Sequence, residues 1–304
     1  MRIAVMGAGS VGGYLGGMLA RGGHDVSLIV RGAHLEAIRA NGLRVLRDHE
    51  EFTVRCAATD DPRQVGEVEL ALLTTKTYQN ATAIPAMAPL VGPETTVLCL
   101  QNGVDSYVGV ADRFGPGRVM PGCVYIEAGS DGPGMARQSG DVVRVVFGEV
   151  NGSLSPRGRA IEEAFVSSGI PAELTADIRT GLWSKFLFIA TMAGTTAMAR
   201  ERLADLMPRP EWRQVVVGCL QEIEAAGRAN GVDFPSDIHE TTLAYIEENL
   251  DDLQASMHTD VMAGRPLELE TFTGAVVRAG RAAGVPTPIN DVIYAMLKPL
   301  ANGA

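Results

Sequence analysis

Cysteine is scarce in this chain, which has only Cys56, Cys99, Cys123 and Cys219, all far apart. Cysteine metal sites use short, regular spacings, and small secreted domains held by disulfides are dense in cysteine. Neither pattern is present, so the sequence predicts no metal site. Three of the four lie in apolar runs, and we expect reduced residues that pack in a core.

Positive charge is also scarce, with 26 Lys and Arg against 36 Asp and Glu and a formal net charge of −10. No local cluster of basic residues reverses this balance. Because nucleic acids and anionic membranes are bound by basic surfaces, we expect neither as a partner. An anionic small-molecule substrate would need a local pocket of positive charge.

Long hydrophobic runs are missing too. The most apolar stretch, residues 186–199, is too short and too rich in threonine and glycine to span a bilayer, and Lys185 bounds it. A strand expected at residues 3–6 and the glycine turn after it leave no room for a cleaved signal peptide. We therefore expect a cytoplasmic protein.

Glycine, by contrast, is abundant, with 35 residues, and three of them form the pattern Gly7-x-Gly9-x-x-Gly12. An apolar run precedes this pattern and apolar residues at helical spacing follow it, which predicts a strand, a tight turn and a helix. Such a turn lets a pyrophosphate approach the backbone at the positive end of the helix dipole, and Gly12 would let the helix pack against the strand. We expect a dinucleotide site here, and the alternative is a purely structural turn. The residues of the predicted site are Gly7, Ala8, Gly9, Ser10, Val11 and Gly12.

The residue after the second predicted strand, residues 25–30, indicates which dinucleotide is bound. Units that bind NAD usually carry an acidic residue near the end of that strand, which holds the ribose 2′-hydroxyl. This chain has Arg31 there, and a guanidinium suits a 2′-phosphate. We therefore predict NADP(H) as the cofactor, against the alternative of a solvated arginine.

Two more polar residues follow predicted strands. Lys76 comes after the apolar run 68–75, and Asn102 comes soon after the strand 95–100. Ligands of open α/β sheets bind beyond the carboxyl ends of the strands. We expect Lys76 and Asn102 to lie with the glycine turn and Arg31 at one edge of a parallel sheet.

The pattern changes at about Asp177, where strand signals stop. Before that point the sequence predicts alternating elements, among them a helix over 81–90 and strands over 118–126 and 142–149. After it, helical periodicity covers residues 182–198, 212–229, 241–250, 267–283 and 291–300. We predict an α/β fold with an N-terminal Rossmann-type dinucleotide-binding domain, residues 1–176, and an all-helical C-terminal domain, residues 177–304. A cleft between two such domains is a favoured place for a substrate.

One lysine lies in an almost wholly apolar predicted helix. Residues 182–194 are apolar on nearly every helical face apart from Lys185, so we expect this helix to be buried. A buried ammonium must find a partner or lose its proton. A lysine so placed can give a proton to a carbonyl oxygen as hydride reaches the carbon. The alternative is a lysine whose stem extends into water.

The segment 256–268 predicts the end of a helix, a Gly-Arg-Pro turn and the first turn of the next helix. If Glu268 points into the cleft, it would hold Lys185 or the cofactor ribose. Otherwise Glu268 and Glu270 are surface carboxylates favoured by the helix dipole. His258 is a candidate acid or base, against the alternative of an exposed or capping histidine.

Together these residues resemble the ketopantoate reductase (2-dehydropantoate 2-reductase) family over essentially the whole chain. The ordered motifs are Gly-Ala-Gly-Ser-Val-Gly at 7–12, Arg-Gly-Ala-His-Leu-Glu-Ala-Ile-Arg-Ala-Asn-Gly-Leu at 31–43, Thr-Lys at 75–76, Gln-Asn-Gly at 101–103, Trp-Ser-Lys at 183–185, and Ser-Met at 256–257 followed by Glu268. The resemblance implies an enzyme that uses NADPH to reduce a branched 2-oxo acid to the 2-hydroxy acid, a step toward pantothenate and coenzyme A.

The resemblance also implies roles for single residues. Lys185 falls on the catalytic lysine, which is the general acid, and Asn102 on an asparagine that touches both cofactor and substrate. Lys76 falls on a lysine of the cofactor side. Ser256 matches a substrate-binding serine, and Glu268 matches a glutamate near the ribose and the reaction centre.

The chain departs from the family at two positions on the lysine helix. Many members carry asparagines four and eight residues after the lysine, where this chain has Ile189 and Ala193. A buried polar substrate atom without a partner costs about 1–3 kcal/mol, so the change should alter which acid is held. The alternatives are a reductase of another 2-oxo acid and a non-enzymatic NADP(H)-binding redox sensor, which the retention of Lys185 disfavours. A homodimer is left open.

Overall fold

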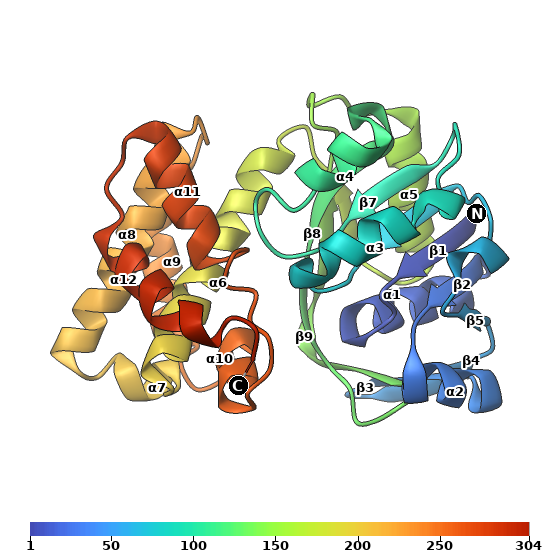
Figure 1. Ribbon diagram of the computed structural model, residues 1–304, viewed down its shortest axis with the longest axis horizontal. Helices are drawn as coiled ribbons and strands as arrows, with labels where there is room; N and C mark the ends of the chain where they lie inside the picture. Colours follow the sequence, from blue (N-terminus) through green and yellow to red (C-terminus); the bar gives the residue numbers. More distant parts are fainter. Residues whose placement is uncertain (304) are drawn as a thin grey trace. The chain divides into compact units, whose positions relative to one another are not determined.

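The computed structural model describes residues 1–303 and divides the chain into two compact units. The first, here called the sheet unit, comprises residues 1–101 and 106–178. The second, here called the helical unit, comprises residues 102–105 and residue 179 to the C-terminus. Figure 1 shows strands in the blue-to-green part of the chain and helices in the yellow-to-red part. The predicted fold class is confirmed.

Ten strands form one sheet in the sheet unit. They are β1 (Arg2–Met6), β2 (Asp25–Ile29), β3 (Leu43–Arg47), β4 (Glu50–Val54), β5 (Ala57–Thr59), β6 (Leu70–Leu73), β7 (Thr96–Cys99), β8 (Val119–Gly129), β9 (Met135–Phe147) and β10 (Ala172–Leu174). Their order is β4-β3-β9-β8-β7-β6-β1-β2-β5, with β10 paired to β9. β2, β1, β6 and β7 pair in parallel, so their carboxyl ends meet at one edge.

Helices cover both faces of this sheet. They are α1 (Ser10–Arg21), α2 (Gly32–Asn41), α3 (Asn80–Ala86), α4 (Val108–Phe114) and α5 (Pro156–Ser167), with short 3₁₀ turns η1 (Pro62–Gln64), η2 (Thr77–Gln79), η3 (Ala88–Leu90) and η4 (Pro116–Arg118). Alternate residues of a strand point to opposite faces. Accordingly, Ile3 and Val5 of β1 pack in one cluster with α1 and α5, whereas Ala4 and Met6 pack in another with α3 and α4.

Glycines let α1 approach the sheet closely. A Cβ atom at Gly12 would lie 2.3 Å from the Thr74 Oγ1 atom, and one at Gly17 would lie 2.5 Å from Val45 Cγ2. Both distances are far below van der Waals contact, so larger side chains at these positions would push the helix away. The sequence predicted this packing role for Gly12 and missed it for Gly17.

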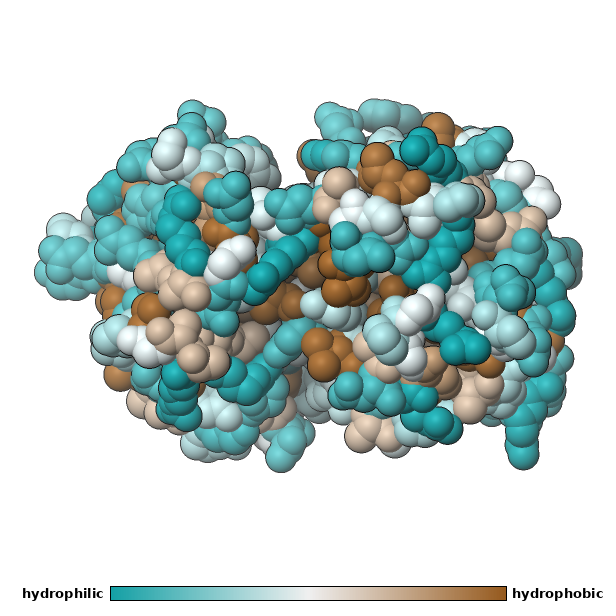
Figure 2. Space-filling view, turned by 90° about the horizontal axis from the view of Figure 1, so that it is seen from above, coloured by the Kyte–Doolittle hydropathy of each residue, from teal (hydrophilic) through white to brown (hydrophobic). Residues whose placement is uncertain are grey.

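Helices alone build the helical unit. They are α6 (Ile178–Ala199), which begins at the end of the sheet unit, α7 (Leu203–Leu206), α8 (Pro210–Ala229), α9 (Ile238–Glu248), α10 (Ser256–Met262), α11 (Thr273–Ala283) and α12 (Pro288–Leu297), with the 3₁₀ turn η5 (Lys298–Leu300). Phe186 of α6 lies edge-on to Trp183 and stacks on Phe272 at 6.5 Å between ring centroids. Within residues 1–303 no helix combines the length and apolarity needed to cross a bilayer. Hydrophilic residues cover most of the face drawn in Figure 2.

The predicted helix over 267–283 is wrong in its first part. Helix α11 begins at Thr273, and Phe272 before it has non-helical torsion angles of φ −93° and ψ −95°. Leu267, Leu269 and Phe272 are all buried, so an apolar pattern that resembles a helix comes from a turn that faces the core. Glu268 therefore does not lie in the first turn of a helix.

Two predicted elements in the sheet unit have different bounds. The helix predicted over 81–90 ends at Ala86 and gives way to η3, because prolines at 85 and 89 interrupt backbone hydrogen bonding. The strand predicted over 142–149 starts at Met135. Its first residues alternate between buried and half-buried, which gives a weaker apolar signal than a strand buried on both faces.

Candidate active site

The glycine turn between β1 and α1 is held to the end of β2. The N–H groups of Gly7 and Ala8 both donate to the carbonyl oxygen of Ile29, at 3.1 and 3.2 Å. Gly9 is exposed, and no heavy atom lies within 4 Å of the place a Cβ atom would take. The first N–H groups of α1 follow directly, and such groups lack partners inside a helix. This open backbone fits a phosphate group at the positive end of the helix dipole.

The end of β6 closes against the glycine turn. The Thr74 hydroxyl donates to the carbonyl oxygen of Gly7 at 2.9 Å. Gly7 has φ +94°, and a Cβ atom there would lie 2.5 Å from Thr75 Cγ2. Gly7 is thus required by both its backbone conformation and its neighbour. The role of Thr74 was not predicted from the sequence, where its signal is a hydroxyl at the end of an otherwise apolar strand.

Arg31 lies directly before α2, which follows β2 by two residues. Its side chain is exposed, and it makes no hydrogen bond or ion pair to residues 1–303. A guanidinium without protein partners retains all of its donors for an anionic ligand. Its place after β2 is the one from which a residue reaches the adenosine ribose in Rossmann-type units.

Lys76 and Gln101 follow β6 and β7. Lys76 is half-buried and lies directly before η2, to which its side chain makes no capping hydrogen bond. Gln101 is buried, and its Nε2 atom donates to the carbonyl oxygen of Thr75 at 2.8 Å and to Asn80 Oδ1 at 2.7 Å. Gln101 therefore ties the ends of two neighbouring strands together. This role of Gln101 was not predicted, although the residue belongs to the Gln-Asn-Gly motif at 101–103.

The structure brings together two predicted site residues of the helical unit. Lys185 on α6 is half-buried, and its Nζ atom donates to Asn102 Oδ1 at 3.1 Å. Trp183, Phe186 and Leu187 around it are buried, as the apolar sequence predicts. The ammonium group is thus hydrogen-bonded to an amide oxygen at a defined place.

The segment that carries Asn102 is held to the rest of the helical unit at two points. Gly103 has φ +101°, and a Cβ atom there would lie 2.8 Å from Thr271 Cγ2. Asp105 Oδ2 accepts from Arg278 Nη2 on α11 at 3.0 Å. These contacts hold Asn102 beside Lys185 although the two residues are 83 positions apart in the chain.

Glu268 and Glu270 differ in exposure. Glu268 is 3% exposed, and its carbonyl oxygen accepts from the N–H groups of Thr271 and Phe272 at 3.1 Å. A surface carboxylate at a helix start is thus the wrong description of Glu268. Glu270 accepts from the Tyr294 hydroxyl at 2.7 Å and pairs with Lys298. Its role in the structure is that of an ion-pair partner.

Ser256 and His258 lie on α10. Ser256 is exposed at the first position of this helix, and no hydrogen bond joins it to Lys185 or Asn102 within residues 1–303. His258 is half-buried. The structure therefore does not bring Ser256 into the Lys185–Asn102 pair.

The two positions where the chain departs from the family lie one and two turns after Lys185 on α6. Ala193 is buried in the main core of the helical unit, and the half-buried Ile189 packs against the same core. Neither side chain has a hydrogen-bonding group.

All four cysteines are reduced thiols that form no disulfide. Burial raises the pKa of Cys56 to about 11 and is the main cause that raises the pKa of Cys219 to about 12. Burial also raises the pKa of Cys99 far above its usual value. Thiols in this state are poor nucleophiles at neutral pH. Within residues 1–303 no group of His, Cys, Asp and Glu side chains could hold a metal ion.

Two family models match the chain. The one described as "Ketopantoate reductase PanE/ApbA" matches residues 3–152, and the one described as "Ketopantoate reductase PanE/ApbA C terminal" matches residues 177–301. Among curated proteins, a 2-dehydropantoate 2-reductase of Mesorhizobium japonicum is 31% identical over 322 residues, which cover 99% of this chain and 98% of the relative.

Solved structures show the same similarity. A PanE/ApbA family ketopantoate reductase of Ralstonia eutropha JMP134 is 31% identical, with a TM-score of 0.91 over 99% of this chain and 98% of that one. D-mandelate dehydrogenase, solved with NADH and anilino(oxo)acetate, is 22% identical, with a TM-score of 0.88 over 99% and 98% of the two chains. At that identity the likeness shows the fold alone.

Proposed function

The chain belongs to the ketopantoate reductase family, and from this premise we propose that it reduces ketopantoate (2-dehydropantoate) to pantoate with NADPH, a step toward pantothenate and coenzyme A. The observation that carries the proposal is the hydrogen bond from Lys185 Nζ to Asn102 Oδ1 at 3.1 Å. This hydrogen bond places a proton donor and an amide next to each other, where both could contact a bound 2-oxo acid.

The sheet unit supplies the cofactor site in this proposal. The open backbone around Gly9 takes the pyrophosphate, and the unpaired Arg31 takes the 2′-phosphate. Lys76 contributes from the end of β6, and residues 1–176 form the cofactor-binding part of the chain. When bound, the reduced nicotinamide supplies the hydride.

The helical unit, with Asn102, supplies the catalytic groups. Lys185 Nζ donates a hydrogen bond to the ketone oxygen of the substrate and gives it a proton as negative charge develops there. Asn102 holds the ammonium in place before the reaction and orients the acid during it. Glu268 and Ser256 complete the site at the ribose and the substrate, and residues 177–304 form the catalytic part.

A second candidate function is the reduction of another 2-oxo acid. Ile189 and Ala193 favour it, because they give the lysine face of α6 no hydrogen-bonding side chain. A site built to bind a substrate hydroxyl rejects analogues without it strongly, whereas an apolar site discriminates by about 1–3 kcal/mol per methylene.

A panel of substrates tests the proposal. The purified protein is mixed with NADPH or NADH and with ketopantoate, its analogue without the hydroxyl, and aromatic and straight-chain 2-oxo acids, and loss of the nicotinamide absorbance is followed. We expect turnover with NADPH, and the highest kcat/KM for ketopantoate. A higher kcat/KM for an apolar 2-oxo acid would favour the second function, and no turnover of any 2-oxo acid would refute both.

A further inference from the structure

One histidine in the motif at residues 31–43 contacts the glycine turn, and the proposed function gives it no role. His34 lies in the first turn of α2 and is half-buried. Its Nε2 atom lies 2.9 Å from the carbonyl oxygen of Ala8, and its Nδ1 atom lies 2.7 Å from the N–H of Gly134. Both ring nitrogens are therefore used, on backbone groups that come from distant parts of the chain.

These two contacts determine the protonation state of the ring. A backbone N–H is always a donor, so Nδ1 of His34 must accept and carries no proton. Nε2 then carries the hydrogen and donates it to Ala8, whose carbonyl oxygen is always an acceptor. His34 is thus neutral, with a single tautomer that satisfies both neighbours.

The bond to Ala8 orients the part of the glycine turn that would meet a phosphate. The carbonyl of Ala8 and the N–H of Gly9 belong to one planar peptide group, so holding the oxygen holds the whole plane. The N–H of Ala8 is held as well, because it donates to Ile29 at 3.2 Å. Both polar groups of Ala8 are therefore fixed from the β2–α2 segment. The Gly9 N–H donates to the carbonyl oxygen of Gly7 at 2.7 Å, so the Ala8–Gly9 peptide is held at both of its polar atoms while the space beside the Gly9 Cα is open.

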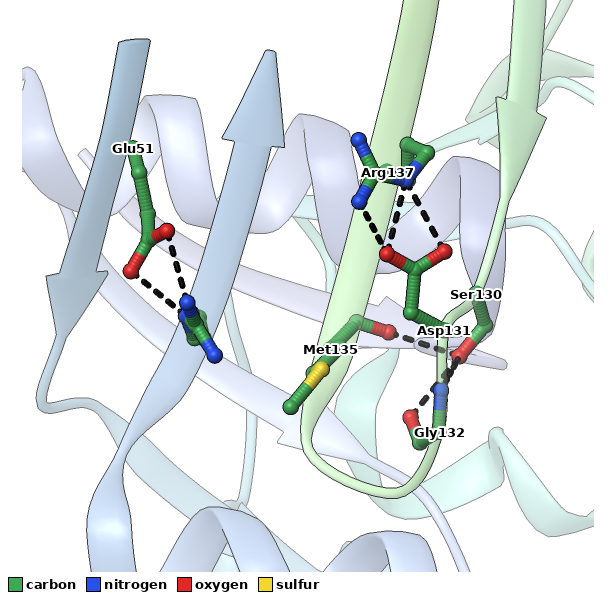
Figure 3. A network of polar contacts seen from close by, with 7 residues as sticks. Glu51, Ser130, Asp131, Gly132, Met135 and Arg137 are labelled. Carbon is green, nitrogen blue, oxygen red and sulfur yellow. Dashed lines mark hydrogen bonds and ion pairs between the residues drawn. The ribbon is translucent and has the colours of Figure 1, made fainter.

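The other contact of His34 is with a turn that is held by its own side chains. Figure 3 shows the β8–β9 turn, where the Ser130 hydroxyl lies 2.8 Å from the carbonyl oxygen of Gly132 and 3.0 Å from that of Met135. Arg137 Nε donates to Asp131 at 2.8 Å in the same view. The turn is therefore a fixed support for the ring.

Gly134 has little freedom of its own at this contact. A Cβ atom there would lie 3.0 Å from Ala37 Cβ on α2, and its carbonyl oxygen accepts from Arg44 N at 2.9 Å. The contacts with Ala37 and Arg44 therefore fix the backbone of Gly134, whose N–H donates to His34. His34 connects this support to the glycine turn.

We propose that His34 is a positioning residue of the cofactor site, which fixes the Ala8–Gly9 peptide for the pyrophosphate by a hydrogen bond from Nε2. This inference rests on the proposed function, because it assumes that the glycine turn binds the nicotinamide cofactor. The pyrophosphate is common to NADPH and NADH, so His34 affects the affinity for both equally. Arg31, in contrast, affects NADPH alone.

Three variants separate the two contacts of the ring. His34→Gln places an amide N–H near the position of Nε2 and keeps the bond to Ala8. His34→Asn places an oxygen near Nδ1 and keeps only the bond to Gly134, and His34→Ala keeps neither. His49, which is exposed on the β3–β4 turn and makes no hydrogen bond to residues 1–303, gives the matched control His49→Ala.

The measurements are the Kd of NADPH and of NADH for the whole protein, from nucleotide fluorescence, with the Tm of each variant. We expect His34→Ala and His34→Asn to raise both Kd values about five- to tenfold, as the loss of one buried hydrogen bond allows. His34→Gln should stay within about twofold to threefold of the wild type, and His49→Ala should equal it.

Three results would overturn the inference. The first is a Kd for His34→Ala within twofold of the wild type. The second is a Kd near the wild-type value for His34→Asn but not for His34→Gln. The third is a loss of affinity that follows the loss of Tm across all variants, whichever contact is kept. If the wild-type protein binds neither nucleotide, the proposed function fails and this inference fails with it. If the wild type binds NADPH and the variants bind equally well, only the inference fails.

Discussion

The cofactor region of the sheet unit and the catalytic region of the helical unit are built in different ways. Backbone groups make most of the first, where Gly7 and Ala8 bond to Ile29 and the turn is open at Gly9. Side chains make the second, where Lys185 meets Asn102. Binding of a phosphate by backbone depends on where the chain runs, whereas proton donation depends on one functional group. Substitutions in the cofactor region should therefore change nucleotide affinity by altering the backbone geometry or the space beside it. Substitutions in the catalytic region should change the reaction rate by removing a functional group.

The largest effect should come from the helical unit. Replacing Lys185 by Met removes the proton donor while preserving most of the apolar stem, so kcat should fall by about 10²- to 10⁴-fold. The Kd of NADPH should stay near the wild-type value, because no backbone group of the glycine turn is changed. Stopped-flow turnover and nucleotide titration check the two parts separately. A kcat within tenfold of the wild type would remove Lys185 from the chemistry.

Two glycines of the sheet unit should respond in opposite ways. A Cβ atom at Gly12 meets Thr74 at 2.3 Å, so Gly12→Ala should lower the stability by about 1–3 kcal/mol. Gly9→Ala meets nothing within 4 Å, so its Tm should equal that of the wild type, while the Kd of NADPH rises tenfold or more because the methyl group occupies the phosphate's place. Thermal unfolding and nucleotide titration of both variants check this contrast. An unchanged Kd for Gly9→Ala would place the pyrophosphate elsewhere.

A smaller effect should distinguish the two nucleotides. Arg31→Ala should weaken NADPH about tenfold, since bonds to a charged group contribute about 1.5–3 kcal/mol each and this site is exposed. The Kd of NADH should change less than twofold. Arg55→Ala is the control, because Arg55 is also exposed and unpaired within residues 1–303. Equal losses for both nucleotides would contradict the choice of NADPH.

The smallest effect should come from the face of α6 beyond Lys185. Asn at positions 189 and 193 adds hydrogen-bonding groups, so the double variant should raise the kcat/KM ratio of ketopantoate to its analogue without the hydroxyl by a few-fold. Ala193 is buried, so the single variant Ile189→Asn guards against a loss of folding. An unchanged ratio in a folded variant would mean that other residues select the substrate.

The two regions were also unequally predictable from the sequence. The strand, turn and helix around Gly7 lie within about twenty residues, so spacing alone predicted the turn and the packing role of Gly12. The sequence could not predict that Thr74 or His34 would meet this turn, because those contacts cross the chain and depend on the sheet order. The hydrogen bond between Asn102 and Lys185 could not be predicted for the same reason, because the two residues are 83 positions apart in the chain.

The helical unit gave weaker signals. Periodicity predicted most of its helices. The buried Leu267, Leu269 and Phe272 have the spacing of a helix, but the chain makes a turn there. The prediction that Glu268 lies in the first turn of a helix was wrong for that reason. A short apolar turn that faces the core has nearly the same pattern of apolar residues as one helical turn, and only tertiary packing distinguishes them.

In the proposed mechanism Lys185 and Asn102 act as one unit, and a double-mutant cycle measures this coupling. The kcat for ketopantoate with NADPH is measured for Lys185→Met, Asn102→Ala and the double variant, with Kd values for NADPH alongside. We expect the double variant to be no slower than Lys185→Met alone, because once one of two residues that act together is lost, removing the other has no further effect. Losses that multiply in the double variant would show that the two side chains act independently and would contradict the account.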